Sequence, residues 1–256
     1  TWPQAAVGRY LARRAACLVV ATPAQRDHHV RHGIPESKIE LIPDGIGPAA
    51  PASTTRQQLL AELGLPSPSR LVGVVGSLEL HKRLKDAIWA ADLLKVIRQD
   101  AHLLIVGDGP HRQRLIRFRD QCLIRDNVHF LGTRRDITRW LPHLDVFWST
   151  SDSGGQPVAM MEAMMAGLPV VATNIPSHRS LVIPDQMGYL VSTGDRAAFA
   201  RITNMLLDKP ELACRLGDAG RQRIRRDFDV DTMVQRHAQL YHGLLASWTR
   251  RPPVTA

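Results

Sequence analysis

The chain has 256 residues, of which 44% are hydrophobic and 22% are charged, a composition typical of folded globular domains. This length accommodates one large domain, or one domain with part of another. No apolar run reaches the roughly 20 residues that a membrane-spanning helix needs. The three cysteines (Cys17, Cys122 and Cys214) are scattered, which argues against a disulfide framework and a cysteine-based metal site and favours a reducing compartment.

The charge is strongly positive, with a formal net value of +9. Arginines gather at residues 112–119 and 221–226, where solvated helix faces are the simplest interpretation. The alternative is attraction to an acidic partner such as an anionic membrane or a phosphate-bearing substrate. Aromatic residues make up only 5%, and no zinc-finger or RNP-type motif occurs, so we expect no nucleic-acid partner.

From residue 70 onward, short apolar runs alternate with longer amphipathic segments. The pattern predicts strands at 71–75, 102–106, 128–131, 145–148, 169–172 and 189–191, and helices over 84–99, 112–123 and 157–165. This alternation predicts an α/β fold with a Rossmann-like parallel sheet flanked by helices. Ligands bind beyond the carboxyl ends of such strands, so the loops after each strand are where a site is expected.

Both ends of the chain depart from this pattern. The first 48 residues contain two strand-like runs, at 17–21 and 39–42, a helix through His32 and a Pro43-Asp44-Gly45 turn. A linker rich in Pro, Ala, Ser and Thr follows at 48–55. We therefore predict three parts: the tail and hinge of a preceding domain (1–48), the Rossmann-like domain (49–228), and a long amphipathic C-terminal helix with its tail (229–256).

The stretch STSDSGGQPVAMMEAMMAGLPVVAT, at residues 149–173, carries the strongest chemical signal. A strand ends there in a Ser/Gly loop, and Pro157 suits the first position of the helix that follows. The free N–H groups and positive end of that helix favour a diphosphate. Glu162, just over a turn into the helix, suits the two vicinal hydroxyls of a ribose, although it also suits the helix dipole without any ligand.

A second stretch, GVVGSLELHKRLK at residues 73–85, follows the first predicted strand of the sheet. Gly76 allows the backbone to approach a ligand closely. Lys82 then offers an ammonium to a phosphate, with Arg83 and Lys85 as nearby alternatives and a plain surface lysine as the simpler interpretation. His28, His29 and His32 have helical spacing but no carboxylate or cysteine partner, so we predict no metal site there.

Taken in their order along the chain, the motifs resemble those of the retaining glycosyltransferases of family 4, which have the GT-B fold. The matching segments are Pro43-Asp44-Gly45-Ile46, Gly73 to Lys85, Val106 to Pro110, Val128 to Gly132, Glu162 to Met164 and Gly167 to Thr173. The resemblance implies two Rossmann-like domains with the active site between them. This chain would supply the C-terminal, donor-binding domain with a remnant of the N-terminal acceptor domain, and by itself it would be inactive.

The implied activity is transfer of a sugar, with retention, from a nucleotide diphosphate sugar to an acceptor, without a metal or other cofactor. The resemblance implies that Lys82, as the catalytic residue, and the amides of Val158 and Ala159 hold the diphosphate, that Glu162 binds the ribose, and that the base lies at residues 130–132. The full implied set of donor-binding positions is Gly76, Ser77, Lys82, Phe130, Leu131, Gly132, Gly154, Gly155, Gln156, Pro157, Val158, Ala159 and Glu162.

Two positions depart from the family pattern. Gly154 stands where the family has a first glutamate, and Ser77 stands where it usually has an arginine. Two alternatives therefore stay open: a non-catalytic relative that binds a nucleotide sugar, and a sugar-nucleotide epimerase. For the acceptor we expect a lipid-linked molecule or a polysaccharide, and for the location the cytoplasm, with peripheral contact at the inner face of the membrane.

Overall fold

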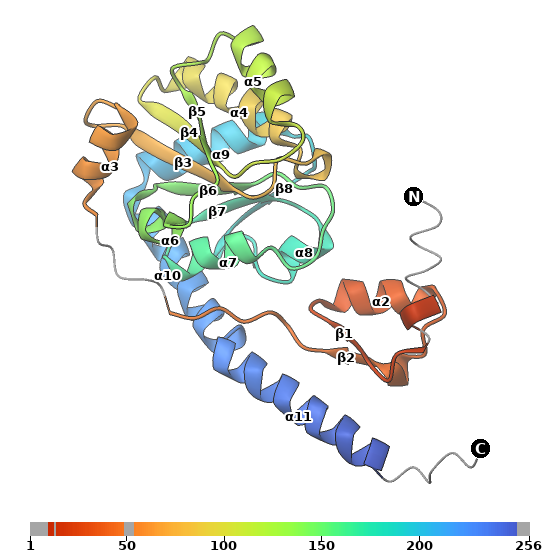
Figure 1. Cartoon of the computed structure of the whole chain (residues 1–256). Coiled ribbons are helices and arrows are strands. Elements are labelled where there is room, and N and C mark those ends of the chain that lie inside the picture. Colours follow the sequence, from red (N-terminus) through yellow and green to blue (C-terminus); the bar gives the residue numbers. More distant parts are fainter. Residues whose placement is uncertain (1–9, 13, 49–53, 250–256) are drawn as a thin grey trace. The chain divides into compact units, whose positions relative to one another are not determined.

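The computed structural model describes residues 10–12, 14–48 and 54–249 (Figure 1). The chain divides into two compact units, one formed by residues 48–227 and one by residues 1–47 together with 228–256. The C-terminal helix, predicted from the sequence as a separate part, thus belongs to the same unit as the N-terminal residues.

The larger unit is built on a six-stranded, fully parallel sheet with the strand order β5-β4-β3-β6-β7-β8. The strands are β3 (Arg70–Val75), β4 (Ala101–Val106), β5 (Val128–Gly132), β6 (Val146–Ser149), β7 (Val170–Thr173) and β8 (Gly188–Val191). From β3 the chain winds outward to β5, and then returns to the other side of β3 and winds through β6 to β8. The winding direction therefore switches between β3 and β6, and a crevice forms at such a switch point.

Helices cover both faces of this sheet (Figure 1). One face carries α4 (Leu84–Ile97), α5 (Arg112–Gln121) and α9 (Arg196–Asp208), and the other carries α7 (Val158–Met165) with α10 (Pro210–Asp227) packed on it. Short helices complete the unit: α3 (Arg56–Leu63), α6 (Ile137–Trp140) and α8 (Pro176–Arg179). The observed fold is the predicted Rossmann-like α/β sheet.

Buried aromatic side chains fix the central strand β6 to the helix layer. Trp148 is 1% exposed, its ring lies 5.5 Å from the ring of Phe199 on α9, and its Nε1–H donates a 2.7 Å hydrogen bond to Thr203 Oγ1. A buried indole N–H without an acceptor would be costly, so Thr203 makes this tryptophan compatible with the core.

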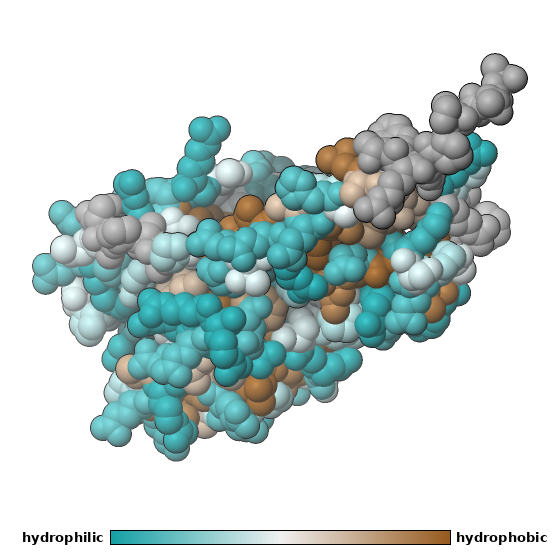
Figure 2. Space-filling model, turned by 90° about the horizontal axis from the view of Figure 1, so that it is seen from below, coloured by the Kyte–Doolittle hydropathy of each residue, from teal (hydrophilic) through white to brown (hydrophobic). Residues whose placement is uncertain are grey.

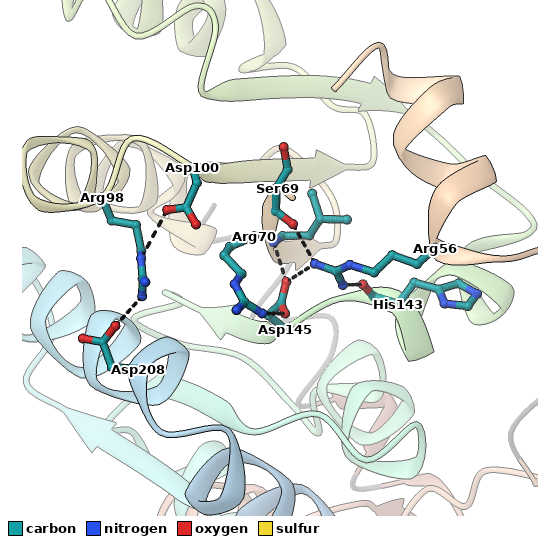
Figure 3. Close-up of polar contacts among 9 residues, drawn as sticks. Arg56, Ser69, Arg70, Arg98, Asp100, His143, Asp145 and Asp208 are labelled. Atoms are coloured by element: carbon teal, nitrogen blue, oxygen red, sulfur yellow. Dashed lines mark hydrogen bonds and ion pairs between the residues drawn. The ribbon is translucent and has the colours of Figure 1, made fainter. Parts of the chain in front are cut away.

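A polar cluster at the amino end of the sheet ties three elements together (Figure 3). The Asp145 carboxylate, with its side chain 16% exposed, accepts hydrogen bonds from Arg56 Nη2 at 2.6 Å, Arg70 Nη1 at 3.3 Å and the Leu71 amide at 2.7 Å. Arg56 also donates to the backbone carbonyls of Ser69 and His143. The cluster therefore joins α3, β3 and the start of β6.

The smaller unit contains two parallel strands, β1 (Leu18–Val20) and β2 (Ile39–Leu41), and the helices α2 (Pro23–Arg31) and α11 (Val230–Thr249). Thr22 and Gln25 form a capping box at the start of α2. The Ile46 amide donates to the Phe228 carbonyl at 3.0 Å, which ties the strand region to the start of α11. Within the described residues, His28, His29 and His32 belong to no group of three or more potential metal ligands.

Figure 2 shows one face of the molecule, on which hydrophilic side chains predominate and apolar ones lie between them. In the part of the chain that the structure describes, every helix is too short or too polar to cross a membrane.

Candidate functional site

A cavity of about 250 Å³ lies at the carboxyl ends of β3 and β6, at the switch point of the sheet. Three segments form its polar part: the end of β3 with the following loop, the end of β6, and the start of α7. The residues that line it are Val74, Val75, Gly76, Ser77, Leu78, Lys82, Leu84, Ile105, Val106, Phe147, Trp148, Ser149, Thr150, Ser151, Gln156, Pro157, Val158, Ala159 and Met160. We call this space the switch-point cavity.

Lys82 supplies the positive charge of the switch-point cavity. It ends a short 3-10 turn, Leu80–Lys82, and a side chain added at Gly76 would place its Cβ 3.7 Å from Lys82 Cε. Thr150 Oγ1, at the end of β6, donates a 2.7 Å hydrogen bond to the Lys82 carbonyl and so fixes the backbone of this lysine. Within the described residues no carboxylate lies within ion-pair distance of the Lys82 ammonium, which leaves its charge available to an anionic ligand.

The start of α7 forms the opposite wall. Pro157 is the N-cap, one position before the helix, rather than the first helical residue that the sequence predicts. Met160 and Met161 donate their amides back to the Pro157 carbonyl, whereas the Ala159 amide meets no acceptor among the described residues. A free amide and the positive end of a helix dipole therefore face the same cavity as Lys82.

A buried histidine connects the ends of β6 and β7 behind this cavity. His178, 1% exposed, lies on α8; its Nδ1 is 2.8 Å from the Thr173 carbonyl and its Nε2 is 3.1 Å from Ser149 Oγ. A carbonyl only accepts, so Nδ1 carries the proton and Nε2 accepts from the Ser149 hydroxyl. Thr173 Oγ1 in turn donates to the Ser151 carbonyl, which ties the loop after β6 to this network.

Burial, and to a smaller extent the nearby positive charge of Lys82, lowers the pKa of His178 to about 4, against the hydrogen bond to Thr173, which raises it. In the unfolded chain the pKa is near 6.5, so the unfolded state binds more protons between these values and stability falls as the pH drops from about 6.5 to 4. The loss reaches up to about 3 kcal/mol. We expect His178→Gln to remove this part of the pH dependence, measured by urea unfolding at pH 7 and at pH 4.5. An unchanged pH dependence in the variant would contradict the assignment.

The structure gathers some of the predicted donor-binding positions in the switch-point cavity and leaves others outside its lining. Those that line it are Gly76, Ser77, Lys82, Gln156, Pro157, Val158 and Ala159. Those outside the lining are Phe130, Leu131 and Gly132 on the edge strand β5, Gly154 and Gly155 in the exposed loop after β6, and Glu162 on α7. The cavity therefore contains the predicted diphosphate positions but not the predicted base and ribose positions.

Glu162 lies on the same side of α7 as Val158 and Ala159, because residues one turn apart share a helix face. Its side chain is half-buried, and burial raises the pKa of its carboxyl group. No hydrogen bond or ion pair joins this side chain to another described residue. A half-buried carboxylate without a partner is costly, and donor groups of a ligand would relieve that cost.

The two departures from the family pattern have different structural settings. Ser77 is exposed at the mouth of the switch-point cavity. Gly154 has φ +145°, a conformation that favours glycine, although no atom lies within 4 Å of the place where a Cβ would be. The absence of a carboxylate at this position is thus matched by a backbone conformation that a glutamate would strain.

Four polar residues of this region were not among the site residues predicted from the sequence. Ser149, Thr150 and Ser151 line the cavity; His178 contacts Ser149, and Thr173 holds the Ser151 carbonyl. The three hydroxyl residues directly follow β6, so their place at the carboxyl end of a predicted strand was a usable signal. His178 gave no such signal, because its contacts depend on how α8 folds back toward β6.

The fold and the cavity together define a doubly wound α/β protein with a crevice at the switch point of its sheet, lined by a lysine and the start of a helix. The family model described as "Glycosyl transferases group 1" matches residues 55–223. The chain therefore belongs to the group 1 glycosyltransferases and has the fold of their GT-B members.

Similar proteins of known sequence include the putative glycosyltransferase EpsD of Bacillus subtilis, 30% identical over 205 residues, which cover 80% of this chain and 54% of EpsD. The N-acetyl-alpha-D-glucosaminyl L-malate synthase of Bacillus anthracis is 26% identical over 189 residues, which cover 73% of this chain and 49% of the synthase. The chain thus spans about half the length of the curated relatives that it matches.

Among solved structures, Anabaena Alr3699/HepE in complex with UDP and glucose matches with a TM-score of 0.85 at 22% identity, covering 93% of this chain and 66% of that one. The sucrose-phosphate synthase of Thermosynechococcus elongatus matches with a TM-score of 0.82 at 25% identity, covering 96% of this chain and 63% of that one. Both similarities extend over nearly the whole of this chain.

Proposed function

We propose that this chain is the donor-binding half of a retaining glycosyltransferase that takes a sugar from a nucleotide diphosphate. The observation that carries the proposal is the switch-point cavity, where the ammonium-bearing Lys82 and the free Ala159 amide line one space. Its volume of about 250 Å³ is below the roughly 300–1,000 Å³ of sites that enclose a whole small molecule, so we assign it to the diphosphate and its immediate surroundings.

Departure of a nucleoside diphosphate develops negative charge on the leaving phosphate. In this proposal Lys82 and the positive end of α7 stabilise that charge, which is commonly the largest contribution to catalysis in such a site. Thr150 contributes by fixing the Lys82 backbone through its hydrogen bond to the carbonyl. Because the positive charge comes from the protein itself, the proposed reaction is independent of a metal.

The ribose and the base extend from the cavity toward α7 and the sheet edge. Glu162, unpaired and on the same helix face as Ala159, accepts hydrogen bonds from the ribose hydroxyls. The base lies toward the end of β5, where the Gly132 carbonyl is joined to the Gly107 amide at 2.8 Å. Support for a nucleotide comes from Alr3699/HepE, whose similar fold was solved with UDP and glucose.

Glu162→Ala is expected to weaken binding of a nucleoside diphosphate about tenfold or more, because charged hydrogen bonds to the ribose are lost. A sharper test varies the ligand as well as the protein. Calorimetry first compares the affinities of UDP, GDP and ADP. The nucleoside diphosphate that binds tightest is then compared with its 2′,3′-dideoxy analogue, which lacks the ribose hydroxyls. The wild-type chain is expected to prefer the ribose form, and Glu162→Ala to lose that preference. An equal preference in both proteins would contradict the ribose role of Glu162.

Transfer itself requires the rest of the protein, since the relatives extend over about twice the matched length. We propose that this remainder supplies an acceptor domain for a lipid-linked or polysaccharide acceptor. The test is to incubate the full-length protein with sugar-linked forms of the nucleoside diphosphate that binds tightest, and to determine the anomeric configuration of the product by proton NMR. An α product from an α-linked donor supports retention, and a β product overturns it.

Gly154 and Ser77 motivate a second candidate, a non-catalytic relative that binds the nucleotide sugar without turning it over. The two candidates differ in one result. Slow hydrolysis or transfer of the donor by the full-length protein, abolished by Lys82→Ala, excludes the non-catalytic candidate; tight donor binding without any turnover excludes the enzyme.

A further inference from the structure

Helix α4 carries a second apolar face that points to solvent. Its inward face, including Ile88, Ala91 and Leu94, is buried in the core. The opposite face carries four exposed hydrophobic residues, which we call the α4 stripe: Trp89 (43% exposed), Leu93 (37%), Val96 (81%) and Ile97 (58%). Leu93, Val96 and Ile97 follow Trp89 by four, seven and eight residues, a spacing that places all four on one side of the helix. A surface helix ordinarily has polar residues there, so the α4 stripe indicates a contact surface.

The α4 stripe continues onto the end of α5. Leu123, which follows α5, is 82% exposed and has a positive φ of 54°. Lys95 Nζ, on α4, donates a hydrogen bond to its carbonyl at 3.2 Å. Phe118 on α5 lies with its ring 6.1 Å from that of Trp89. Helices α4 and α5 lie next to each other on one face of the sheet (Figure 1), so the exposed apolar side chains extend over both.

Positive charges accompany this apolar surface. Lys85, Lys95 and Arg114 lie on the two helices, and none of them forms an ion pair with a carboxylate of a described residue. Asp86 does not neutralise them, because it is occupied by Arg83 at 2.6 Å and Arg196 at 2.7 Å. Asp92, also on α4, offsets one of the three charges, so the face keeps a positive excess.

A cavity of about 450 Å³, different from the switch-point cavity, opens beside Trp89. Lys85 and Arg114 line it together with Trp89 and Phe118, and Arg83, Arg196, Glu79, Asp86 and Asp152 line it as well. Asp86 pairs with both Arg83 and Arg196, and Asp152 pairs with Arg83, so the four Lys and Arg side chains of the lining exceed its three carboxylates by one. Lys85 Nζ stands 4.9 Å from the centre of the Phe118 ring. The cavity thus combines aromatic walls with two cations that lack a carboxylate partner, which suits a phosphate group attached to an apolar body.

We propose that the face formed by α4 and α5 docks on an anionic phospholipid membrane. The α4 stripe and Leu123 enter the interface between headgroups and acyl chains, and Lys85, Lys95 and Arg114 contact lipid phosphates. An anionic bilayer is the partner that fits this face, because its apolar interior complements the α4 stripe and its negative charge complements the cations. The inference does not depend on the proposed donor site, because the two cavities share only Leu84 in their linings.

The test is sedimentation of the whole chain with vesicles of phosphatidylcholine alone or mixed with phosphatidylglycerol. The first variant pairs Val96→Ser with Ile97→Ser, and the second pairs Lys85→Gln with Arg114→Gln. Matched controls are Val234→Ser with Leu245→Ser, which removes exposed apolar side chains from α11, and Arg215→Gln on α10. The wild-type chain and both controls are expected to bind the anionic vesicles only, and each α4 variant to bind about tenfold more weakly.

Three results would overturn the proposal: no binding to anionic vesicles, equal binding to neutral ones, or binding of the Val96/Ile97 variant at the wild-type level. Calorimetry with a nucleoside diphosphate on the same variants keeps this proposal separate from the donor site. The α4 variants are expected to bind the nucleotide like the wild-type chain. A failure of vesicle binding would therefore leave the proposed donor site untouched, and a failure of nucleotide binding would leave the membrane proposal untouched.

Discussion

Lys82→Ala is expected to weaken binding of a nucleoside diphosphate by about 10- to 100-fold, the cost of a lost charged hydrogen bond in a partly enclosed site. Within the described residues, Lys82 has no carboxylate in ion-pair distance, and its side chain lies over Gly76 in the same cavity as the Ala159 amide. The variant leaves the helix end in place but removes the point charge opposite it. Isothermal calorimetry with the nucleoside diphosphate that binds tightest measures the effect.

Lys85→Ala is the matched control for this experiment. It removes an exposed lysine three positions further along, on α4 and outside the switch-point cavity, and is expected to leave nucleotide affinity unchanged. If the two variants lose affinity equally, the effect reflects general electrostatic attraction to a chain of net charge +9 rather than a contact at Lys82.

Asp145→Ala is expected to lower the free energy of unfolding by about 3 kcal/mol, toward the lower end of the range for breaking a largely buried ion pair. The change leaves the guanidinium groups of Arg56 and Arg70 without their shared carboxylate. It also removes the acceptor of the Leu71 amide, near the start of the central strand β3. Both arginines are about one-third or more exposed, so water recovers part of the loss. Urea unfolding followed by circular dichroism measures the change.

A second carboxylate in the same view provides the control (Figure 3). Asp208 accepts from Arg98 at 2.8 Å but is 50% exposed, so Asp208→Ala is expected to cost less than about 1 kcal/mol. Comparable destabilisation by both variants would contradict the structural role given to the Asp145 cluster.

The strands of the sheet were predictable because they are short apolar runs that end at glycine, proline or polar residues. The predicted strand at 71–75 corresponds to β3 at Arg70–Val75, and that at 102–106 to β4 at Ala101–Val106. Fully buried strands of a parallel sheet carry hydrophobic residues on both faces, and this composition is visible without any structure. The alternation of strands and helices then indicated the parallel α/β class.

Helix α10 was missed for an identifiable reason. Its buried positions are Leu216, Gly217, Gly220 and Ile224, and two glycines among four conceal the apolar stripe that marks a helix. The structure explains Gly217: a Cβ there would lie 1.9 Å from the Gly167 carbonyl oxygen, because α10 passes too close to the turn after α7 for a side chain. Helix α3 was missed despite a readable capping box, Thr55 with Gln58, and a left-handed Gly64 at its end.

The candidate site was predictable to the extent that it follows from local sequence. Gly76 and Lys82 directly follow β3, and Pro157 to Ala159 start a helix after β6, so the parallel fold brings these segments to one edge. The His178 network was not predictable, because it requires the turn after β7 to return to β6. The role given to Glu162 comes from its place in the helix and from the family resemblance, that given to residues 130–132 comes from the resemblance alone, and both stay predictions.

The central claim is that the switch-point cavity holds the diphosphate of a nucleotide, and a crystal structure of the chain grown with a nucleoside diphosphate tests it most directly. We expect both phosphates to lie between Lys82 Nζ and the Ala159 amide, with the ribose hydroxyls on the Glu162 carboxylate. A nucleotide bound elsewhere on the chain, with this cavity filled by solvent alone, would contradict the account.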